Sequence, residues 1–258
     1  EELREKGLLK QDDGAWIVDL QKYGMPPALI LKRDGSTLYP TRDIAAAIWR
    51  KKEYDFDKCI YVTSAGQSLH FAQWFKVVEL MGYDWADRLV HVPYGTMSVG
   101  GEKLASRTGN VILLDDLFAE AISKAEKIIE EKNPVLADRH ETAVAVGTGA
   151  VIFNALSGSR IKDTNFTWES ALSFDGNTGP YVQYTYARCA SLLRKAGGYG
   201  SGDGVTPGAD EVTLIRTLLR FPSRVNAALG EYEPSIISRY VLDVCAAPGG
   251  KATELGAR

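Results

Sequence analysis

The sequence predicts an α/β region followed by an all-α region. Between residues 28 and 95, strand-like apolar runs alternate with helix-like segments, an order typical of a parallel sheet with crossover helices. From Arg139 onward the apolar residues recur at helical spacing, and we expect no further strands there. A stretch rich in Gly, Pro and Ser, residues 197–210, has little to bury and is expected to link two of these helices.

The chain opens with a segment, residues 1–10, that we expect to be a helix already in progress. Residues 28–39 predict a β-hairpin, because two apolar runs flank an Asp-Gly dipeptide that tolerates positive φ. Pro40 suits the first turn of a helix. The helix predicted over residues 41–53 has its apolar side chains on one face.

The next elements follow the β–α–β order of a parallel sheet. Residues 58–65 are predicted to form a short buried strand, and residues 68–82 a helix that ends at a glycine. Residues 89–95 predict a second strand, residues 96–110 a loop, and residues 114–132 a helix with two aspartates at its N-terminal end. The two strands are therefore expected to pair in parallel.

The later segments with helical periodicity make up the all-α region. They cover residues 140–158, 179–197, 210–222 and 235–247. Within the first of them, Gly147-Thr148-Gly149 resembles half of a dinucleotide-binding fingerprint, but no strand precedes it and no third glycine follows. We interpret these small residues as a place where two helices approach each other closely.

The composition argues against several classes of protein. The formal net charge of -3 gives no general attraction to nucleic acid, so any RNA contact must come from local basic patches. No apolar run approaches the roughly 20 residues that a membrane span needs, and we expect no membrane association. The three cysteines and three histidines lack metal-ligand spacing, so we expect reduced thiols and no metal site.

Three polar residues are candidates for a ligand site at the C-terminal edge of the predicted sheet. Tyr39 and Asp43 flank the predicted helix start at Pro40, and Gln67 follows a predicted strand. A phenol, a carboxylate and an amide together suit a planar cation, because a carboxylate binds guanidinium through two parallel hydrogen bonds. On the residues alone, Asp43 as a helix N-terminal charge and Gln67 as a loop cap remain equally open. His70 is a neighbour of the same edge.

A second candidate site is the loop over residues 100–110. Lys103 and Arg107 provide two cations, and the glycines allow the backbone to approach a ligand. Ser106 and Thr108 add hydroxyl donors. Such a loop is suited to stabilising the charge that develops on a polyphosphate during transfer. A solvated turn is an equally open interpretation of these residues.

Six segments of the chain form a recognisable series. They are DGSTLYPTRDIAAAIWR (34–50), GQSLHFAQWF (66–75), EKLASRTGN (102–110), SRIKDTNFTW (159–168), LSFDGNTGPYVQYTYAR (172–188) and YEPSIISRYVLDV (232–244). In this order and at this spacing they resemble arginyl-tRNA synthetase, and the resemblance extends from residue 1 to about residue 247. It implies an α/β fold, the second half of a Rossmann-like class I synthetase core, followed by an all-α anticodon-binding domain. The implied division is a catalytic part over residues 1–178 and a helical part over residues 179–258.

The resemblance implies roles for the first candidate site. In the family, arginine reacts with ATP to form arginyl-adenylate and pyrophosphate, and the arginyl group then passes to the tRNA 3′ end. Tyr39, Asp43 and Gln67 match the positions that hold the arginine substrate, with Asp43 on the guanidinium. His70 is implied to contact ATP, which is bound with Mg²⁺.

The resemblance also implies a role for the loop. Its KLASR stretch, residues 103–107, matches the position of the class I signature KMSKS, whose cations stabilise charge on the pyrophosphate side. Lys103 and Arg107 are therefore the implied catalytic residues, and both are implied to contact ATP together with Ser106. Lys103 is the single lysine kept from the signature, so this loop departs from the family pattern.

The helical part is implied to bind tRNA(Arg). Three cations in it are candidate contacts with the tRNA backbone: Arg188, Arg194 and Lys195. An ordinary solvated helix face remains an open interpretation of each. The resemblance further implies a cytoplasmic protein, and we expect it to be a monomer.

One signature of the family does not occur in this sequence. No two histidines are close enough to form His-Ile-Gly-His, which binds ATP in the first half of the class I core. Both ends of the chain look cut, and we interpret it as a fragment of the enzyme that does not make arginyl-adenylate alone. A non-catalytic, synthetase-like RNA-binding module is the alternative interpretation.

The C-terminal residues resemble another family. VLDVCAAPGGKATELGAR, residues 241–258, resembles the S-adenosylmethionine motif of RNA cytosine methyltransferases, so a fusion with such an enzyme is a further alternative. The helical pattern continues up to Ala247, and Pro248-Gly249-Gly250 then interrupts it. We interpret residues 248–258 as an artefactual join and expect them to pack poorly.

Overall fold

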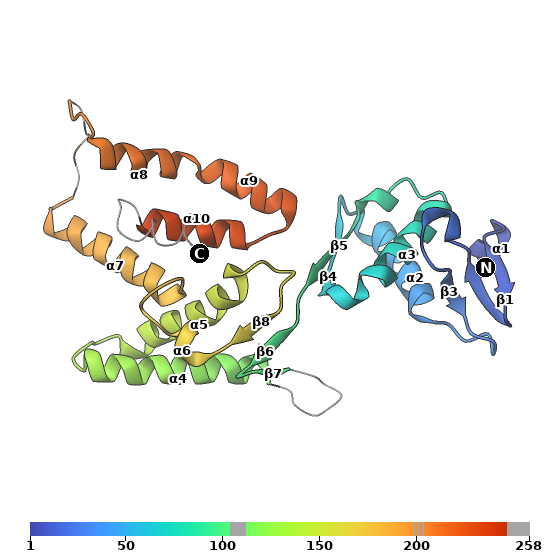
Figure 1. Ribbon diagram of the computed structural model, residues 1–258, viewed down its shortest axis with the longest axis horizontal. Helices are drawn as coiled ribbons and strands as arrows, with labels where there is room; N and C mark the ends of the chain where they lie inside the picture. Colours follow the sequence, from blue (N-terminus) through green and yellow to red (C-terminus); the bar gives the residue numbers. More distant parts are fainter. Residues whose placement is uncertain (104–111, 199, 201, 203, 247–258) are drawn as a thin grey trace. The chain divides into compact units, whose positions relative to one another are not determined.

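Figure 1 shows the computed structural model of the chain. The structure describes residues 1–103, 112–198, 200, 202 and 204–246. The chain divides into two compact units, Glu1–Tyr94 and Gly95–Arg258. Each unit has a hydrophobic core of its own.

The first unit begins with a three-stranded antiparallel sheet. Its strands are β1 (Leu9–Asp12), β2 (Ala15–Val18) and β3 (Ala28–Leu31), in the order β1-β2-β3. Asp13 and Gly14 join β1 to β2 with φ of 42° and 80°, the left-handed conformation that the commonest two-residue hairpin turn requires. Asp-Gly is therefore the local sequence signal for this hairpin.

Two predictions for this part of the chain were wrong in extent. The expected helix over residues 1–10 is the short α1 (Glu2–Glu5), because the chain then pairs with β2 as strand β1. In the hairpin expected over residues 28–39, the second strand is reduced to a single bridge between Leu31 and Thr37. The strand β3 finds its partner in β2 instead.

The parallel strand pair expected from the β–α–β order is confirmed. β4 (Cys59–Ser64) and β5 (Leu89–Tyr94) pair in parallel, and α3 (Ser68–Leu80) lies between them in the sequence. α2 (Tyr39–Tyr54) precedes β4 and has Pro40 in its first turn, as predicted. Three short 3₁₀ turns complete the unit: η1 (Gln21–Tyr23), η2 (Ala65–Gln67) and η3 (Ala86–Arg88).

The prediction that β4 is buried is wrong for one of its faces. Tyr61 packs against Phe71 and Trp74 of α3, with ring centroids 5.3 and 5.2 Å apart. Ile60 and Val62 point the other way and are 46% and 63% exposed. Successive side chains of a strand alternate between its two faces, and α3 lies on the Tyr61 face.

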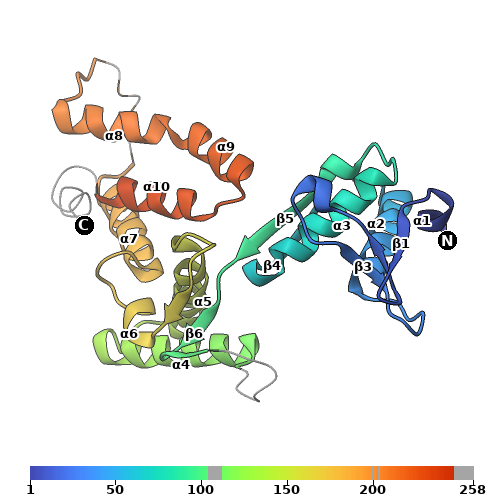
Figure 2. The same ribbon diagram turned by 45° about the vertical axis from the view of Figure 1, so that its right-hand side comes forward.

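The core of the first unit forms where α2 and α3 pack against the strands (Figure 2). Trp74, Val77 and Val78 of α3 are fully buried there. Ile44 and Ala47 of α2 are buried as well, which confirms the apolar face predicted for this helix. The packing holds α2 beside α3, and this contact positions the candidate site.

The second unit contains a small sheet where we predicted a loop and no later strand. β6 (Met97–Val99) pairs with β7 (Glu102–Lys103) in antiparallel fashion and with β8 (Thr164–Phe166) in parallel. The turn between β6 and β7 uses two glycines with φ of 59° and 87°. Both predictions were therefore wrong, because strands of two or three residues are too short to show an alternating pattern.

The other elements of the second unit are helices. They are α4 (Leu114–Lys132), α5 (Arg139–Ser157), α6 (Trp168–Ala171), α7 (Gly179–Lys195), α8 (Ala209–Leu219), α9 (Phe221–Glu231) and α10 (Ser235–Ala246). The helices predicted over residues 140–158, 179–197 and 235–247 are confirmed as α5, α7 and α10. The helix predicted over residues 210–222 is correct only up to Leu219, where α8 ends, and α9 was not predicted. The described part of the predicted linker lies between α7 and α8. The helical interpretation of residues 235–246 is thus correct, whereas residues 248–258 lie outside the described residues.

Small residues let α5 approach its neighbours closely, as predicted. A Cβ added to Gly147 would lie 2.7 Å from the backbone nitrogen of Ile122 in α4, a distance that real Cβ atoms do not show. Gly149, one residue past Thr148, faces the side chain of Gln183 in α7. The Gly-Thr-Gly stretch is therefore a helix-packing site between α4 and α7.

The start of α7 is fixed by Thr178 in the conspicuous NTGP part of the sequence. Its Oγ1 accepts a hydrogen bond from the Tyr181 N–H at 3.2 Å and donates one to the Ser173 carbonyl at 2.6 Å. Pro180 follows in the first turn of the helix and is fully buried. This cap satisfies backbone donors that a helix start otherwise leaves unpaired.

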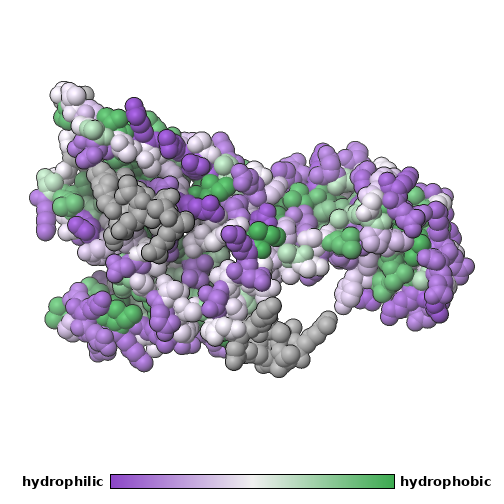
Figure 3. Space-filling model, in the orientation of Figure 1, coloured by the Kyte–Doolittle hydropathy of each residue, from purple (hydrophilic) through white to green (hydrophobic). Residues whose placement is uncertain are grey.

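Apolar side chains also reach the surface of the second unit. Leu219 of α8 and Leu229 of α9 are 74% and 70% exposed. Figure 3 shows hydrophobic atoms at the surface in the region of these two helices. The α8–α9 pair is thus less completely packed than α4 and α5, whose facing residues are buried.

Candidate functional site

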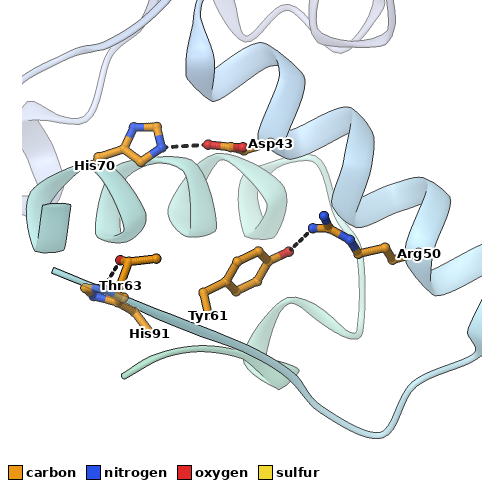
Figure 4. A network of polar contacts seen from close by, with 6 residues as sticks. All are labelled: Asp43, Arg50, Tyr61, Thr63, His70 and His91. Carbon is orange, nitrogen blue, oxygen red and sulfur yellow. Dashed lines mark hydrogen bonds and ion pairs between the residues drawn. The ribbon is translucent and has the colours of Figure 1, made fainter. Parts of the chain in front are cut away.

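Asp43 and His70 meet between α2 and α3 in the first unit (Figure 4). His70 Nε2 lies 2.7 Å from Asp43 Oδ2. The two side chains are 26% exposed for His70 and 38% exposed for Asp43, so both are accessible to a ligand. His70 is in the first turn of α3, shortly after β4 ends. Asp43 therefore lies near the carboxyl end of a parallel strand, where open α/β sheets bind ligands.

The two other residues predicted for this site lie at the surface. Tyr39 opens α2 and is 75% exposed. Gln67 ends η2 directly before α3, and its side chain makes no capping hydrogen bond there. The first turn of α2 contains no acidic residue, so the structure does not support Asp43 as an N-terminal charge. It does not support Gln67 as a cap either, because the Gln67 side chain makes no capping hydrogen bond. Among the described contacts, the one that joins two predicted site residues is Asp43 with His70.

Aromatic contacts support His70 from the core side. Its ring meets Phe71 edge-on, with centroids 5.4 Å apart. Phe71 is buried and stacks on His91 of β5 at 4.3 Å, with the rings nearly parallel. Thr63 Oγ1 of β4 in turn lies 2.9 Å from His91 Nε2. The His70 ring is thereby anchored, through Phe71, on both strands of the parallel pair.

Arg50 and Tyr61 form a second polar contact in the same region, also drawn in Figure 4. Arg50 Nη1 donates a hydrogen bond to the Tyr61 hydroxyl at 3.1 Å. Burial raises the pKa of Tyr61, a neighbouring Cys59 raises it further, and Arg50 opposes the rise. Tyr61 therefore holds a neutral hydroxyl that fixes the Arg50 side chain.

Sequence reasoning missed the supporting residues Thr63, His91 and Arg50. Tyr61 and Thr63 are two residues apart on β4, so their side chains lie on the same face of the strand. His91 of β5 lies on that face too, because it is the residue paired with Tyr61. The alternation along each strand was present in the sequence, but which strand positions lie opposite each other depends on the register. The structure pairs Tyr61 with His91 and Thr63 with Pro93.

The second candidate site is described up to Lys103. Lys103 is the last residue of β7, and its backbone pairs with Ser98 of β6. Asn165 of β8 holds the base of this hairpin, because its Oδ1 accepts hydrogen bonds from Ser98 Oγ at 3.0 Å and from the Gly101 N–H at 2.9 Å. The predicted residues Ser106 and Arg107 lie outside the described residues.

The cations predicted to contact tRNA lie on α7 and are exposed. The Arg188 guanidinium carbon lies 5.8 Å from the centroid of the Tyr184 ring, one helical turn earlier. Arg188 and Lys195 are seven residues apart, which places them on the same side of the helix, and Arg194 is in the last turn. The three therefore present positive charge to solvent along the C-terminal half of α7.

Family models match both parts of the chain. The model described as tRNA synthetases class I (R), catalytic domain, matches residues 1–168. This chain belongs to the class I arginyl-tRNA synthetase family. The model described as DALR anticodon binding domain matches residues 182–248. A class I catalytic part followed by a helical anticodon-binding domain is the fold class predicted from the sequence, which is thereby confirmed.

Relatives in the family support the same assignment. Proteins named arginine–tRNA ligase from Alkaliphilus metalliredigens and Clostridioides difficile are 49% and 52% identical over 251 and 248 residues, 96% and 95% of this chain. The chain spans only 44% of the length of each. The solved arginyl-tRNA synthetase of Thermus thermophilus is 28% identical, with a TM-score of 0.85 over 95% of this chain and 47% of that one.

The fold is also shared with a more distant member. The solved arginyl-tRNA synthetase of Plasmodium falciparum is 24% identical, with a TM-score of 0.80 over 95% of this chain and 43% of that one.

Within the described residues, no helix is both long and apolar enough to span a membrane. The same residues contain no group of three or more His, Cys, Asp or Glu side chains placed to hold a metal ion.

Proposed function

We propose that this chain supplies the arginine-binding and anticodon-binding parts of an arginine–tRNA ligase. The observation that supports this most directly is the position of Asp43. Its carboxylate is partly exposed, held by His70, and close to the carboxyl end of β4. A fixed carboxylate at this edge suits a guanidinium substrate, because guanidinium donates two parallel hydrogen bonds to one carboxylate.

Tyr39 and Gln67 complete the proposed arginine site. Both are exposed, and the described residues give neither side chain a hydrogen-bond partner, so their phenol and amide groups are available to a ligand. A neutral amide adds a directional hydrogen bond without a second charge. The site thereby selects a cationic, planar side chain over a neutral one of the same shape.

In the proposed reaction, a carboxylate oxygen of arginine attacks the α-phosphorus of ATP and pyrophosphate leaves. A hydroxyl of the terminal tRNA ribose then attacks the activated carbonyl, and AMP leaves. Lys103 and Arg107 are proposed to stabilise the negative charge that grows on the leaving pyrophosphate. Ser106 is proposed as a further ATP contact. Mg²⁺ is proposed to accompany the ATP phosphates, and no step above depends on a residue that would hold it.

Residues 1–178 are proposed as the catalytic part and residues 179–258 as the helical part that binds tRNA(Arg). Charging of tRNA accompanies protein synthesis, so we propose that the protein acts in the cytoplasm. We also propose that it is a monomer.

An NMR titration of the ¹⁵N-labelled chain tests the arginine site. We expect L-arginine to shift amide signals at the starts of α2 and α3, and citrulline, its neutral isostere, to shift them far less. Asp43→Asn keeps the shape and removes the charge, so it should abolish the arginine response. Absence of any response to arginine, or equal responses to arginine and citrulline, would contradict the proposed site. Arginine-dependent ATP–pyrophosphate exchange by this chain would contradict its interpretation as a catalytically incomplete part.

A further inference from the structure

We propose that His70 is a positioning residue for arginine: it orients the Asp43 carboxylate toward the substrate guanidinium. The inference rests on the proposed function and gives His70 a role different from the ATP contact that the family resemblance implies. Its starting point is the contact of 2.7 Å between His70 Nε2 and Asp43 Oδ2. Figure 4 shows the imidazole edge directed at the carboxylate across the gap between α2 and α3.

The contact leaves most of the carboxylate free for a substrate. An ionised carboxylate offers two oxygens with about four acceptor positions, and His70 occupies one position on Oδ2. The described residues give Asp43 no other side-chain partner. Oδ1 and the second position on Oδ2 are therefore available for the two N–H groups of a guanidinium.

The surroundings of His70 keep this geometry fixed. The ring is held edge-on against Phe71, which is 5% exposed. Phe71 stacks on His91, whose Nε2 contacts Thr63 Oγ1. Asp43 itself lies between Arg42 and the buried Ile44 on a helix whose apolar face is packed. A carboxylate that is already oriented loses less conformational entropy when the ligand binds, and this raises affinity.

Three substitutions of His70 separate positioning from other roles. In His70→Gln the amide nitrogen reaches the place of Nε2 and can still donate to Asp43. In His70→Asn the shorter side chain places its amide at the level of Nδ1, out of reach. His70→Ala removes the donor altogether. The comparison of Gln with Asn keeps the test decisive even if the Ala variant does not fold.

The matched control is a second histidine–carboxylate pair among the described residues. His140 Nδ1 contacts Glu126 Oε1 at the same 2.7 Å in the second unit, whereas the proposed site belongs to the first unit. His140→Ala therefore removes a histidine–carboxylate contact of the same length, although a more exposed one, and should leave arginine affinity unchanged. Thermal unfolding of each variant monitors folding in parallel.

Arginine and ATP affinities of the 258-residue chain are measured by NMR titration at neutral pH. We expect His70→Ala and His70→Asn to lower arginine affinity about tenfold, the loss typical of a hydrogen bond to a charged group, and His70→Gln to restore most of it. ATP affinity should stay within twofold of the unsubstituted chain wherever it is measurable. The ¹⁵N signals of the His70 ring should also move when arginine is added.

Two results would overturn the inference while the proposed function stands. One is unchanged arginine affinity in His70→Asn, and the other is a loss of ATP affinity without a loss of arginine affinity, which would support the ATP role instead. If the unsubstituted chain shows no arginine binding, or if Asp43→Asn binds arginine normally, the proposed arginine site itself is wrong and the inference fails with it.

Discussion

Gly179 at the start of α7 lies directly against the backbone of Gly149 in α5. A Cβ added to Gly179 would meet the Gly149 carbonyl oxygen at 2.6 Å and the Gly149 carbonyl carbon at 2.9 Å. Backbone atoms cannot move aside as the end of a flexible side chain can. The α5–α7 contact therefore depends on glycine at this position, and Thr178 beside it caps the helix.

We expect Gly179→Ala to lower the free energy of unfolding of the second unit by about 1–3 kcal/mol, the range found for overpacked cores. Urea unfolding followed by circular dichroism measures the change. Gly158→Ala is the matched control, because a Cβ there has no atom within 4 Å, and it should alter stability by less than about 0.5 kcal/mol. Equal effects of both substitutions would show that the close approach of α5 and α7 is not what limits this position.

Ser235 joins two charged side chains at the start of α10. It is fully buried, its Oγ donates to Glu233 Oε1 at 2.9 Å, and it accepts a hydrogen bond from Arg239 Nη2 at 3.0 Å. Ser235→Ala should therefore destabilise the second unit by about 1–2 kcal/mol, because partners in a partly buried network are left unsatisfied. In Ser223→Ala the lost hydroxyl is exposed and bonds only to Arg220 of the preceding turn, so we expect almost no change in the urea midpoint. A neutral Ser235→Ala would mean that both charged groups are satisfied without this hydroxyl, by solvent and by the Arg160 and Ser235 N–H groups that still donate to Glu233.

Asp19 links the stability of the first unit to pH. A hydrogen bond from the Gln21 N–H, and then the Lys10 ammonium, hold the pKa of Asp19 below its ordinary value of 3.8. A carboxylate with a lowered pKa in the folded state stabilises that state above the pKa of the unfolded chain. This contribution is lost as the pH falls through the lowered, folded-state pKa.

Asp19→Asn keeps an oxygen acceptor for Gln21 and removes the charge. We expect it to lower the melting temperature at neutral pH, with a difference from the unsubstituted chain that shrinks from about pH 5 downward and vanishes in strong acid. Asp12→Asn serves as the control, since the described residues give its side chain no hydrogen bond or ion pair. A difference for Asp19→Asn that persists unchanged at the lowest pH would contradict the electrostatic origin.

Long elements and motifs were predictable from the sequence, whereas short strands and side-chain partnerships were not. The helix predicted over residues 114–132 is found with the same bounds as α4, because nineteen residues hold several repeats of the helical period. β6 and β8 have three residues each, too few to establish the alternating pattern of a strand. They are stabilised by Asn165 and by pairing across 66 residues or more of sequence, which no local signal reveals.

The candidate site shows the same division. Asp43, Tyr39 and Gln67 were recognisable because a carboxylate, a phenol and an amide follow strands or start helices in a motif of known spacing. The contact of Asp43 with His70 depends on how α2 packs against α3. It joins residues 27 positions apart, and their spacing alone gives no reason to pair them.

The exposed cations of α7 give a prediction that separates RNA binding from an ordinary solvated helix face. Each phosphate contact releases counterions, so the dependence of the logarithm of affinity on the logarithm of salt concentration falls by about 0.7–0.9 per contact removed. We expect Arg188→Ala, Arg194→Ala and Lys195→Ala each to reduce this slope for tRNA(Arg) by such an amount. Lys52→Ala, which removes an exposed cation of α2 in the first unit, should leave the slope unchanged.

A contact with the phosphate backbone of RNA carries no information about the base sequence. Such contacts can therefore be distinguished from contacts that read bases. The α7 substitutions should weaken the binding of tRNA(Arg) and of an unrelated tRNA by similar factors, measured by filter binding at several salt concentrations. A loss confined to tRNA(Arg) would instead mean that these side chains read bases. Unchanged slopes in all three variants would show that Arg188, Arg194 and Lys195 belong to a solvated helix face. RNA would then have to be held by other residues of the helical part.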